Sequence, residues 1–267
     1  MPPALRIVKA HSFRQLGYAL LMGKTVQTTA TAPSRNQAVS DQLYLTESSP
    51  DLADVQVLML SLSGSRAYGL DHEQSDVDIR GLYLAELRQL LGLSAFRPQK
   101  SISVGPADDC QLYELGRFAQ LAIGSNPTAI ELFWTPLLRE SEQWRTLRDN
   151  RHLFLSQKLI NSHIGFAHSA MKQVRQIDAG AEPPNAASKR KKAARTAARV
   201  LCQAASLLST QEMDIRYSHG ITGEEPLDEI ARQIVELVTK VEAIDTKLPL
   251  APNLQAVNDL IIDLRGF

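Results

Sequence analysis

The feature that most constrains the fold is a polar loop between two apolar segments. Residues 55–62 read VQVLMLSL, a short apolar run that ends at a glycine and is typical of a buried central strand. Residues 64–81 follow with the sequence GSRAYGLDHEQSDVDIRG, and we predict a second strand over 76–84. Two aspartates one residue apart therefore come at the start of this second strand.

In a strand, side chains at positions i and i+2 point to the same face of the sheet. Asp76 and Asp78 should therefore project together, with Val77 and Ile79 on the opposite face. Two ionised carboxylates held this close repel each other, and a divalent cation relieves the repulsion. Mg²⁺ binds through one or two carboxylates and completes its shell with substrate phosphates. Mn²⁺ is the alternative, and we expect Asp76 and Asp78 to hold the metal.

The turn before the aspartates suits a phosphate group. Gly64 allows close approach of the backbone, Ser65 offers a hydroxyl and an N–H, and a short helix over 65–68 would leave free N–H groups. Arg66 in the same turn is our choice to hold a triphosphate, with Arg80 as the alternative; either could instead pair with a local acid. An Asp-x-Asp pair is common in surface loops, but the buried strand and Gly-Ser turn favour a nucleotide site.

The rest of the chain predicts an α+β protein, with a small mixed sheet and flanking helices followed by an α-helical C-terminal bundle. We expect an N-terminal extension at 1–50 that includes a short helix over 11–23, a catalytic domain at 51–138 and a helical domain at 139–267. Further strands are expected at 101–104 and 109–113. Helices are expected at 85–91, from 114, from Pro127, and over 139–149, 151–177, 188–209, 225–245 and 254–264.

Composition excludes several classes of protein. The 267 residues carry no net charge, so affinity for nucleic acid must come from a local patch. Cys110 and Cys202 lie far apart and lack metal-site spacing, which favours a reduced, cytoplasmic compartment. Residues 1–24 contain only a short apolar run, so we expect no signal peptide, and no stretch approaches the ~20 apolar residues of a membrane span.

In its Gly-Ser turn and Asp-x-Asp pair, residues 64–81, the chain resembles the nucleotidyltransferase superfamily of DNA polymerase beta, and within it the RNA-repair-pathway DNA polymerase beta family. A second similarity is the N-P-x-x-x-E-x-L pattern from Asn126 to Leu132. A third is Lys192 with Arg199, with Thr196 where the family has a histidine. The resemblance covers roughly residues 55–210, and its most specific matches are Gly64, Ser65, Arg66, Tyr68, Gly69, Ser75, Asp76, Asp78 and Gly81.

The resemblance implies a third carboxylate on a neighbouring strand, as a metal ligand or as the base for an attacking hydroxyl. The candidates are Asp108, Asp109 and Glu114. Strand alternation places Asp109 on the polar face, whereas Glu114 is better placed to begin the next helix and Asp108 suits a turn. We therefore choose Asp109.

The segment SKRKKAARTAAR, residues 188–199, is the main basic concentration. On a helix, Lys192, Arg195 and Arg199 lie opposite an apolar stripe. They form either a solvated outer face or a surface that contacts the phosphates of a nucleotide or an RNA.

Together these features predict transfer of a nucleotidyl group from an NTP such as ATP to a hydroxyl. Asp76, Asp78 and Asp109 would be catalytic and bind metal. Gly64, Ser65, Arg66, Lys192 and Arg199 would bind the nucleotide. The resemblance implies an RNA acceptor. The alternatives are an antitoxin-type transferase that adds AMP to a partner protein, and an inactive module that binds a nucleotide or RNA.

Overall fold

The computed structural model describes residues 56–72, 75–93, 96–102, 109–180 and 183–267. All of them belong to one compact unit, Val39–Phe267. The predicted N-terminal extension, with its expected helix at 11–23, lies outside the described residues. The domain boundary near residue 138 stays a prediction. Among the described residues, no helix combines the length and the apolarity needed to cross a bilayer.

The described strands form one mixed sheet in the order β3-β4-β2-β1-β5, in which β5 is Leu137–Glu140. β1 (Gln56–Leu62) is antiparallel to β2 (Asp78–Leu84), which is parallel to β4 (Asp109–Glu114). β3 (Gln99–Ile102) pairs antiparallel with β4. Only glycine fits at position 81, because the strands approach closely here and a Cβ would lie 2.6 Å from the Met59 carbonyl oxygen.

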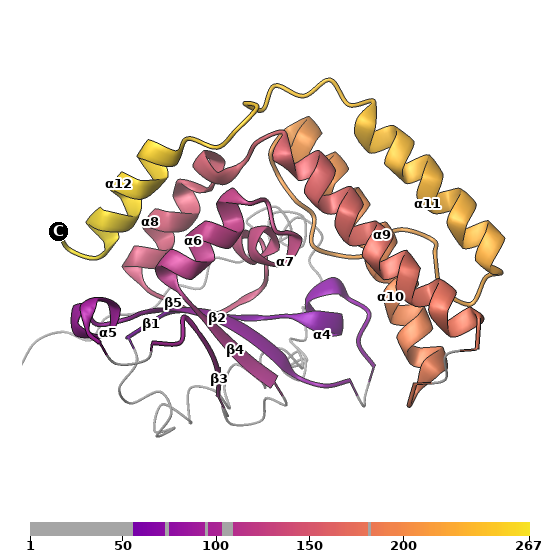
Figure 1. Ribbon diagram of the computed structural model, residues 1–267, viewed down its shortest axis with the longest axis horizontal. Coiled ribbons are helices and arrows are strands. Elements are labelled where there is room, and N and C mark those ends of the chain that lie inside the picture. Colours follow the sequence, from indigo (N-terminus) through magenta and orange to yellow (C-terminus); the bar gives the residue numbers. More distant parts are fainter. Residues whose placement is uncertain (1–55, 73–74, 94–95, 103–108, 181–182) are drawn as a thin grey trace, which may run out of the picture. The chain divides into compact units, whose positions relative to one another are not determined.

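The helices lie mainly on one side of the sheet (Figure 1). α6 (Leu115–Ile123), α7 (Pro127–Ile130) and α8 (Glu142–Asp149) pack over the sheet, and their apolar side chains join Leu58 and Leu82 in one core. A second apolar cluster, which includes Leu60, Leu62 and Ile79, lies on the opposite face. The confirmed class is therefore a mixed α/β fold. The described helices also include α4 (Gly64–Tyr68), α5 (Leu87–Leu91) and α12 (Leu254–Leu264).

The helical part is built around α9 (Lys158–Asp178), α10 (Ala186–Thr210) and α11 (Leu227–Glu242), which pack beside one another (Figure 1). α10 is rich in alanine, and Ala193, Ala194, Ala197 and Ala198 are all buried. Such small side chains allow α9 and α10 to approach closely. This packing fixes the position of the basic residues of α10 relative to α9.

Two predicted helices have N-terminal parts with a different structure. The helix predicted over 139–149 begins as strand β5 (Leu137–Glu140), which pairs with the edge of β1, and α8 follows with Ser141 as its N-cap. The helix predicted over 151–177 is divided into a 3₁₀ turn, Arg151–Phe154, and α9. Pairing with β1 decides the first case, because four residues have no stable extended structure of their own.

Candidate active site

The predicted carboxylates lie at one end of the sheet. Asp78 is the first residue of β2 and is directly opposite Asp109, the first residue of β4. Asp76 precedes β2 in irregular backbone, so the strand begins two residues later than predicted. Asp76 and Asp78 nevertheless line the same cavity, and Val77 between them is buried. The expected i, i+2 arrangement is therefore present.

These carboxylates influence one another electrostatically. Burial raises the pKa of Asp78 above its ordinary value, and the negative charges of Asp109 and Asp76 raise it further. The positive charges of Lys192 and Arg80 act in the opposite direction. Asp78 is therefore a partly desolvated carboxylate among like charges, an environment in which a cation would be stabilising.

Gly64 is required by the position of Asp78. Its φ of +61° lies in the left-handed region, and a Cβ built on it would be 2.1 Å from Oδ2 of Asp78. Only glycine permits both this backbone conformation and this close contact. Ser65, the next residue, lines the cavity with Asp76 and Asp78. Both residues belong to the short helix α4, which covers the residues 65–68 where the sequence allowed a short helix.

Arg66 contacts the loop that carries Asp76. Its side chain is buried, Nε donates to the carbonyl oxygen of Asp76 at 3.0 Å, and Nη2 donates to that of Ser75 at 2.7 Å. Arg66 thus fixes the backbone from which Asp76 projects. Its Nη1 is buried and has no hydrogen-bond partner among the described residues.

A hydrogen-bonded row of polar side chains continues across the sheet from Asp109. The Gln111 amide donates to Oδ2 of Asp109 at 3.2 Å, and Nη1 of Arg80 donates to both the Gln111 amide oxygen and the Tyr113 hydroxyl. Gln99 also donates to Gln111. These contacts hold Asp109 on the same face of the sheet as Asp78. They also bond the Arg80 guanidinium to side chains of β4.

The cavity in front of the carboxylates has a volume of about 590 Å³ and brings α4, the aspartate loop and α10 together. The predicted site residues Gly64, Ser65, Lys192 and Arg199 all line it. Arg66 and Asp109 are not among the lining residues. The full lining consists of Gly64, Ser65, Tyr68, Leu70, His72, Ser75, Asp76, Asp78, Ala187, Ser188, Lys191, Lys192, Arg195, Thr196 and Arg199.

Arg199 belongs to a buried network rather than to a solvated face. Its guanidinium pairs with Glu131, and the side chains of the two residues are 11% and 3% exposed. The same guanidinium lies 3.9 Å from the centre of the Tyr68 ring, and the Tyr68 hydroxyl donates to Oε1 of Glu131 at 2.8 Å. Gln203 contacts both Arg199 and Glu131. This network connects α4, α10 and the segment after α7.

Burial, and after it the charge of Glu131, raises the pKa of Tyr68 above its usual range. The Tyr68 hydroxyl is therefore a neutral donor at physiological pH. The sequence patterns that contain Tyr68 and Glu131 were noted at the outset, but no role was predicted for either residue. A glutamate in the otherwise apolar stretch AIELF is the sequence signal that could have indicated a buried, paired acid.

The other cations of the basic segment differ in how they are held. Arg195 donates to the carbonyl oxygen of Thr222 at 2.9 Å, and Lys191 pairs with Glu224. Arg190 pairs with Asp178 at 2.6 Å. Lys192 has no hydrogen bond or ion pair among the described residues. Lys192 is thus the lining cation available to a ligand.

The alternatives for the third carboxylate have different environments. Glu114 is buried, pairs with Arg265 at 2.6 Å and accepts the Gly116 N–H as the N-cap of α6. Asp108 lies outside the described residues. Within the described ranges, no three or more His, Cys, Asp or Glu side chains form a group that could hold a metal ion by themselves. Asp109 as a metal ligand or base stays a prediction.

The site and the mixed sheet agree with the nucleotidyltransferase-like class that the resemblance implies. The family model for the RNA repair pathway DNA polymerase beta family matches residues 36–261, and the chain belongs to that family. This confirms the resemblance noted in the sequence. A solved structure of a nucleotidyltransferase-like protein from Exiguobacterium sibiricum 255-15 is 12% identical, with a TM-score of 0.32 over 85% of this chain and 73% of that chain. No curated protein matches the sequence.

Proposed function

We propose that this protein is a divalent-metal-dependent nucleotidyltransferase that transfers a nucleoside monophosphate from an NTP to a hydroxyl of RNA. The observation that carries the proposal is the cavity in which Asp76 and Asp78 face Lys192, a cation without a partner among the described residues. Carboxylates for a metal and a cation for phosphates are the two halves of a nucleotide site. Membership of the family supports the same reaction class and the RNA acceptor.

The residues suit the ion that this chemistry needs. All candidate ligands are carboxylate oxygens, which Mg²⁺ and Mn²⁺ prefer, and Asp78 is partly desolvated beside two other negative charges. Asp76 and Asp78 would hold the ion, with the substrate phosphates as further ligands. The bound ion would neutralise charge that develops on the phosphates.

The residues of the chain have distinct roles in the proposed transfer. The acceptor hydroxyl oxygen forms a bond to the α-phosphorus, the bond from that phosphorus to the β-phosphate oxygen breaks, and pyrophosphate leaves. The hydroxyl proton passes to Asp109. Ser65 and Lys192 contact the phosphates, while Arg66 fixes the loop that carries Asp76. Arg199 holds α10 against Tyr68 and Glu131.

NTPs that carry a radioactive label on either the α- or the γ-phosphate test which group is transferred. The protein is incubated with Mg²⁺, either an RNA pool or a cell extract, and each of these labelled NTPs. We expect α-label in RNA and no γ-label, since pyrophosphate leaves. Transfer of γ-label would indicate a kinase. Label that enters the partner proteins of a cell extract but not RNA would instead support AMP transfer to protein. No label in any macromolecule would overturn the proposal.

A further inference from the structure

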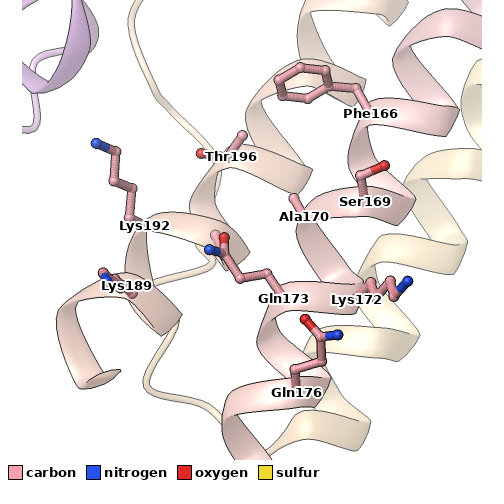
Figure 2. A pocket seen from close by; sticks show the side chains of 10 residues that line it. Phe166, Ser169, Ala170, Lys172, Gln173, Gln176, Lys189, Lys192 and Thr196 are labelled. Atoms are coloured by element: carbon pink, nitrogen blue, oxygen red, sulfur yellow. The ribbon is translucent and has the colours of Figure 1, made fainter. Parts of the chain in front are cut away.

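A second hollow lies beside the catalytic cavity, between α9 and α10 (Figure 2). We call it the α9/α10 groove, and its volume is about 730 Å³. Figure 2 shows Gln173 and Gln176 projecting from α9, with Lys189 and Lys192 on α10. The lining residues are Phe166, Ser169, Ala170, Lys172, Gln173, Gln176, Lys189, Lys192, Ala193 and Thr196.

The groove adjoins the catalytic cavity. Lys192 and Thr196 line both hollows. The charge of Lys192 also lowers the pKa of Asp78, so this lysine lies within electrostatic reach of the catalytic carboxylates. A ligand in the groove that extends past Lys192 would therefore reach the hollow that Asp76 and Asp78 line.

The lysines of the groove are available to bind a ligand. Lys172, Lys189 and Lys192 are exposed and have no hydrogen bond or ion pair among the described residues. By contrast, Arg190 and Lys191, which lie between Lys189 and Lys192 in the sequence, pair with Asp178 and Glu224. The basic segment is thus divided into cations that hold the fold and cations that face the groove.

The lining has the chemistry of a nucleic-acid surface. No carboxylate is found among the described lining residues, so an anionic strand meets no repelling negative charge from them. Gln173 and Gln176 offer amide donors and acceptors, and Phe166 offers an aromatic ring on which a base can stack. Phe166 is also the only large apolar side chain among the described lining residues. A protein segment would have few apolar anchors, and interfaces between proteins depend on such anchors.

We propose that the α9/α10 groove binds single-stranded RNA, with Lys172 and Lys189 contacting its phosphates and Lys192 at the entrance to the catalytic cavity. This inference rests on the proposed function, because it supplies the path by which the acceptor hydroxyl reaches Asp78. It assigns the specificity for a polynucleotide to α9 and α10 and not to the carboxylate site.

The test compares two variants that lose the same charge. The Lys172→Ala/Lys189→Ala double variant removes both proposed contacts. The control is Lys158→Ala/Lys240→Ala, which removes two exposed lysines that line neither hollow and have no ion pair among the described residues. Binding of a fluorescent single-stranded RNA is measured by anisotropy without NTP over a range of salt concentrations. Thermal unfolding checks that each variant is folded.

Each phosphate contact contributes about −0.7 to the slope of log affinity against log salt. The test variant should therefore have a slope flatter by about 1.4 and an affinity lower by about 25-fold at 0.1 M salt. The control should match the wild type. Phe166→Leu keeps an apolar side chain but removes the ring, and should weaken binding about fivefold or more.

Equal affinities and slopes for the test and control variants would overturn the groove assignment. A wild type that binds an acidic protein but no RNA would overturn it as well. Because NTP is absent, the result is separate from the proposed reaction. Normal RNA binding without any label transfer would contradict the proposed function and leave the groove assignment supported.

Discussion

Replacing Glu131 by Gln removes the carboxylate from the buried network around Arg199 and leaves the guanidinium without its anion. The two side chains are 3% and 11% exposed, so water cannot replace the lost partner. The new amide can still accept the Tyr68 hydroxyl, which now bonds Oε1 of Glu131 at 2.8 Å. The change therefore isolates the loss of the ion pair more cleanly than a truncation would.

The expected cost is about 3–5 kcal/mol of unfolding free energy, because breaking a buried pair from one side leaves an uncompensated charge. Arg199→Met should cost about 2–4 kcal/mol, since the remaining carboxyl can take up a proton. The double variant Glu131→Gln/Arg199→Met should cost much less than the sum, with a coupling energy of at least about 2 kcal/mol.

Urea denaturation measures these differences. With a slope of about 3 kcal/mol per M, Glu131→Gln should lower the midpoint by about 1–1.7 M. Glu236→Gln is the matched control: it breaks an ion pair with Arg232 whose side chains are 54% and 59% exposed, and should change stability by less than about 0.5 kcal/mol. Additive single-variant effects, or a cost below about 1 kcal/mol for Glu131→Gln, would refute the assignment of a coupled buried network.

Three further predictions concern single residues. Gly64→Ala should lower activity at least about tenfold and stability by about 1 kcal/mol, because its Cβ would lie 2.1 Å from Oδ2 of Asp78; wild-type activity would contradict this. Asp78→Asn should raise the free energy of unfolding slightly, by less than about 1 kcal/mol for a half-exposed group, and the melting temperature with it: burial raises the pKa of this carboxyl, so its charged form destabilises the fold at neutral pH. A lower melting temperature would oppose that reasoning. Burial lowers the pKa of His163 to about 4, so between pH 6.5 and 4 the unfolded chain binds a proton that the folded chain does not. Stability should fall by about 3 kcal/mol as pH drops through this window, and His163→Asn should flatten the pH profile measured by urea denaturation.

The parts of the site that depend on local sequence could be predicted. The Gly-Ser turn and the alternation around Asp78 depend on neighbouring residues and on strand geometry, and both are present. The long C-terminal helices followed from their apolar periodicity. Pro127 begins α7, as its fixed backbone predicts.

The parts that depend on tertiary contacts could not be predicted. β5 is short, and only the edge of β1 makes it a strand. The sequence places Arg66 beside a phosphate site, but the structure turns its guanidinium under the loop to bond Ser75 and Asp76. Arg199 has the helical position of a surface cation, yet Glu131, 68 residues earlier, draws it into the core.

The α9/α10 groove illustrates the same limit. Lys172 and Lys189 belong to different helices, and no periodicity in either helix relates them. The close packing of the alanine-rich face of α10 against α9 brings them to one hollow. The basic segment was visible in the sequence, but the division between its paired and its unpaired cations required the contacts.

The central claim is that Asp78 takes part in nucleotidyl transfer, and the rate of incorporation of α-labelled NTP into RNA tests it most directly. Wild type, Asp78→Asn and Asp245→Asn are compared with Mg²⁺ at pH 8, where the Asp245 variant serves as a control that changes an exposed aspartate remote in sequence from the cavity. We expect wild type and Asp245→Asn to label RNA at similar rates, and Asp78→Asn to be at least about 1,000-fold slower while folded. Equal rates in Asp78→Asn and wild type would contradict the account.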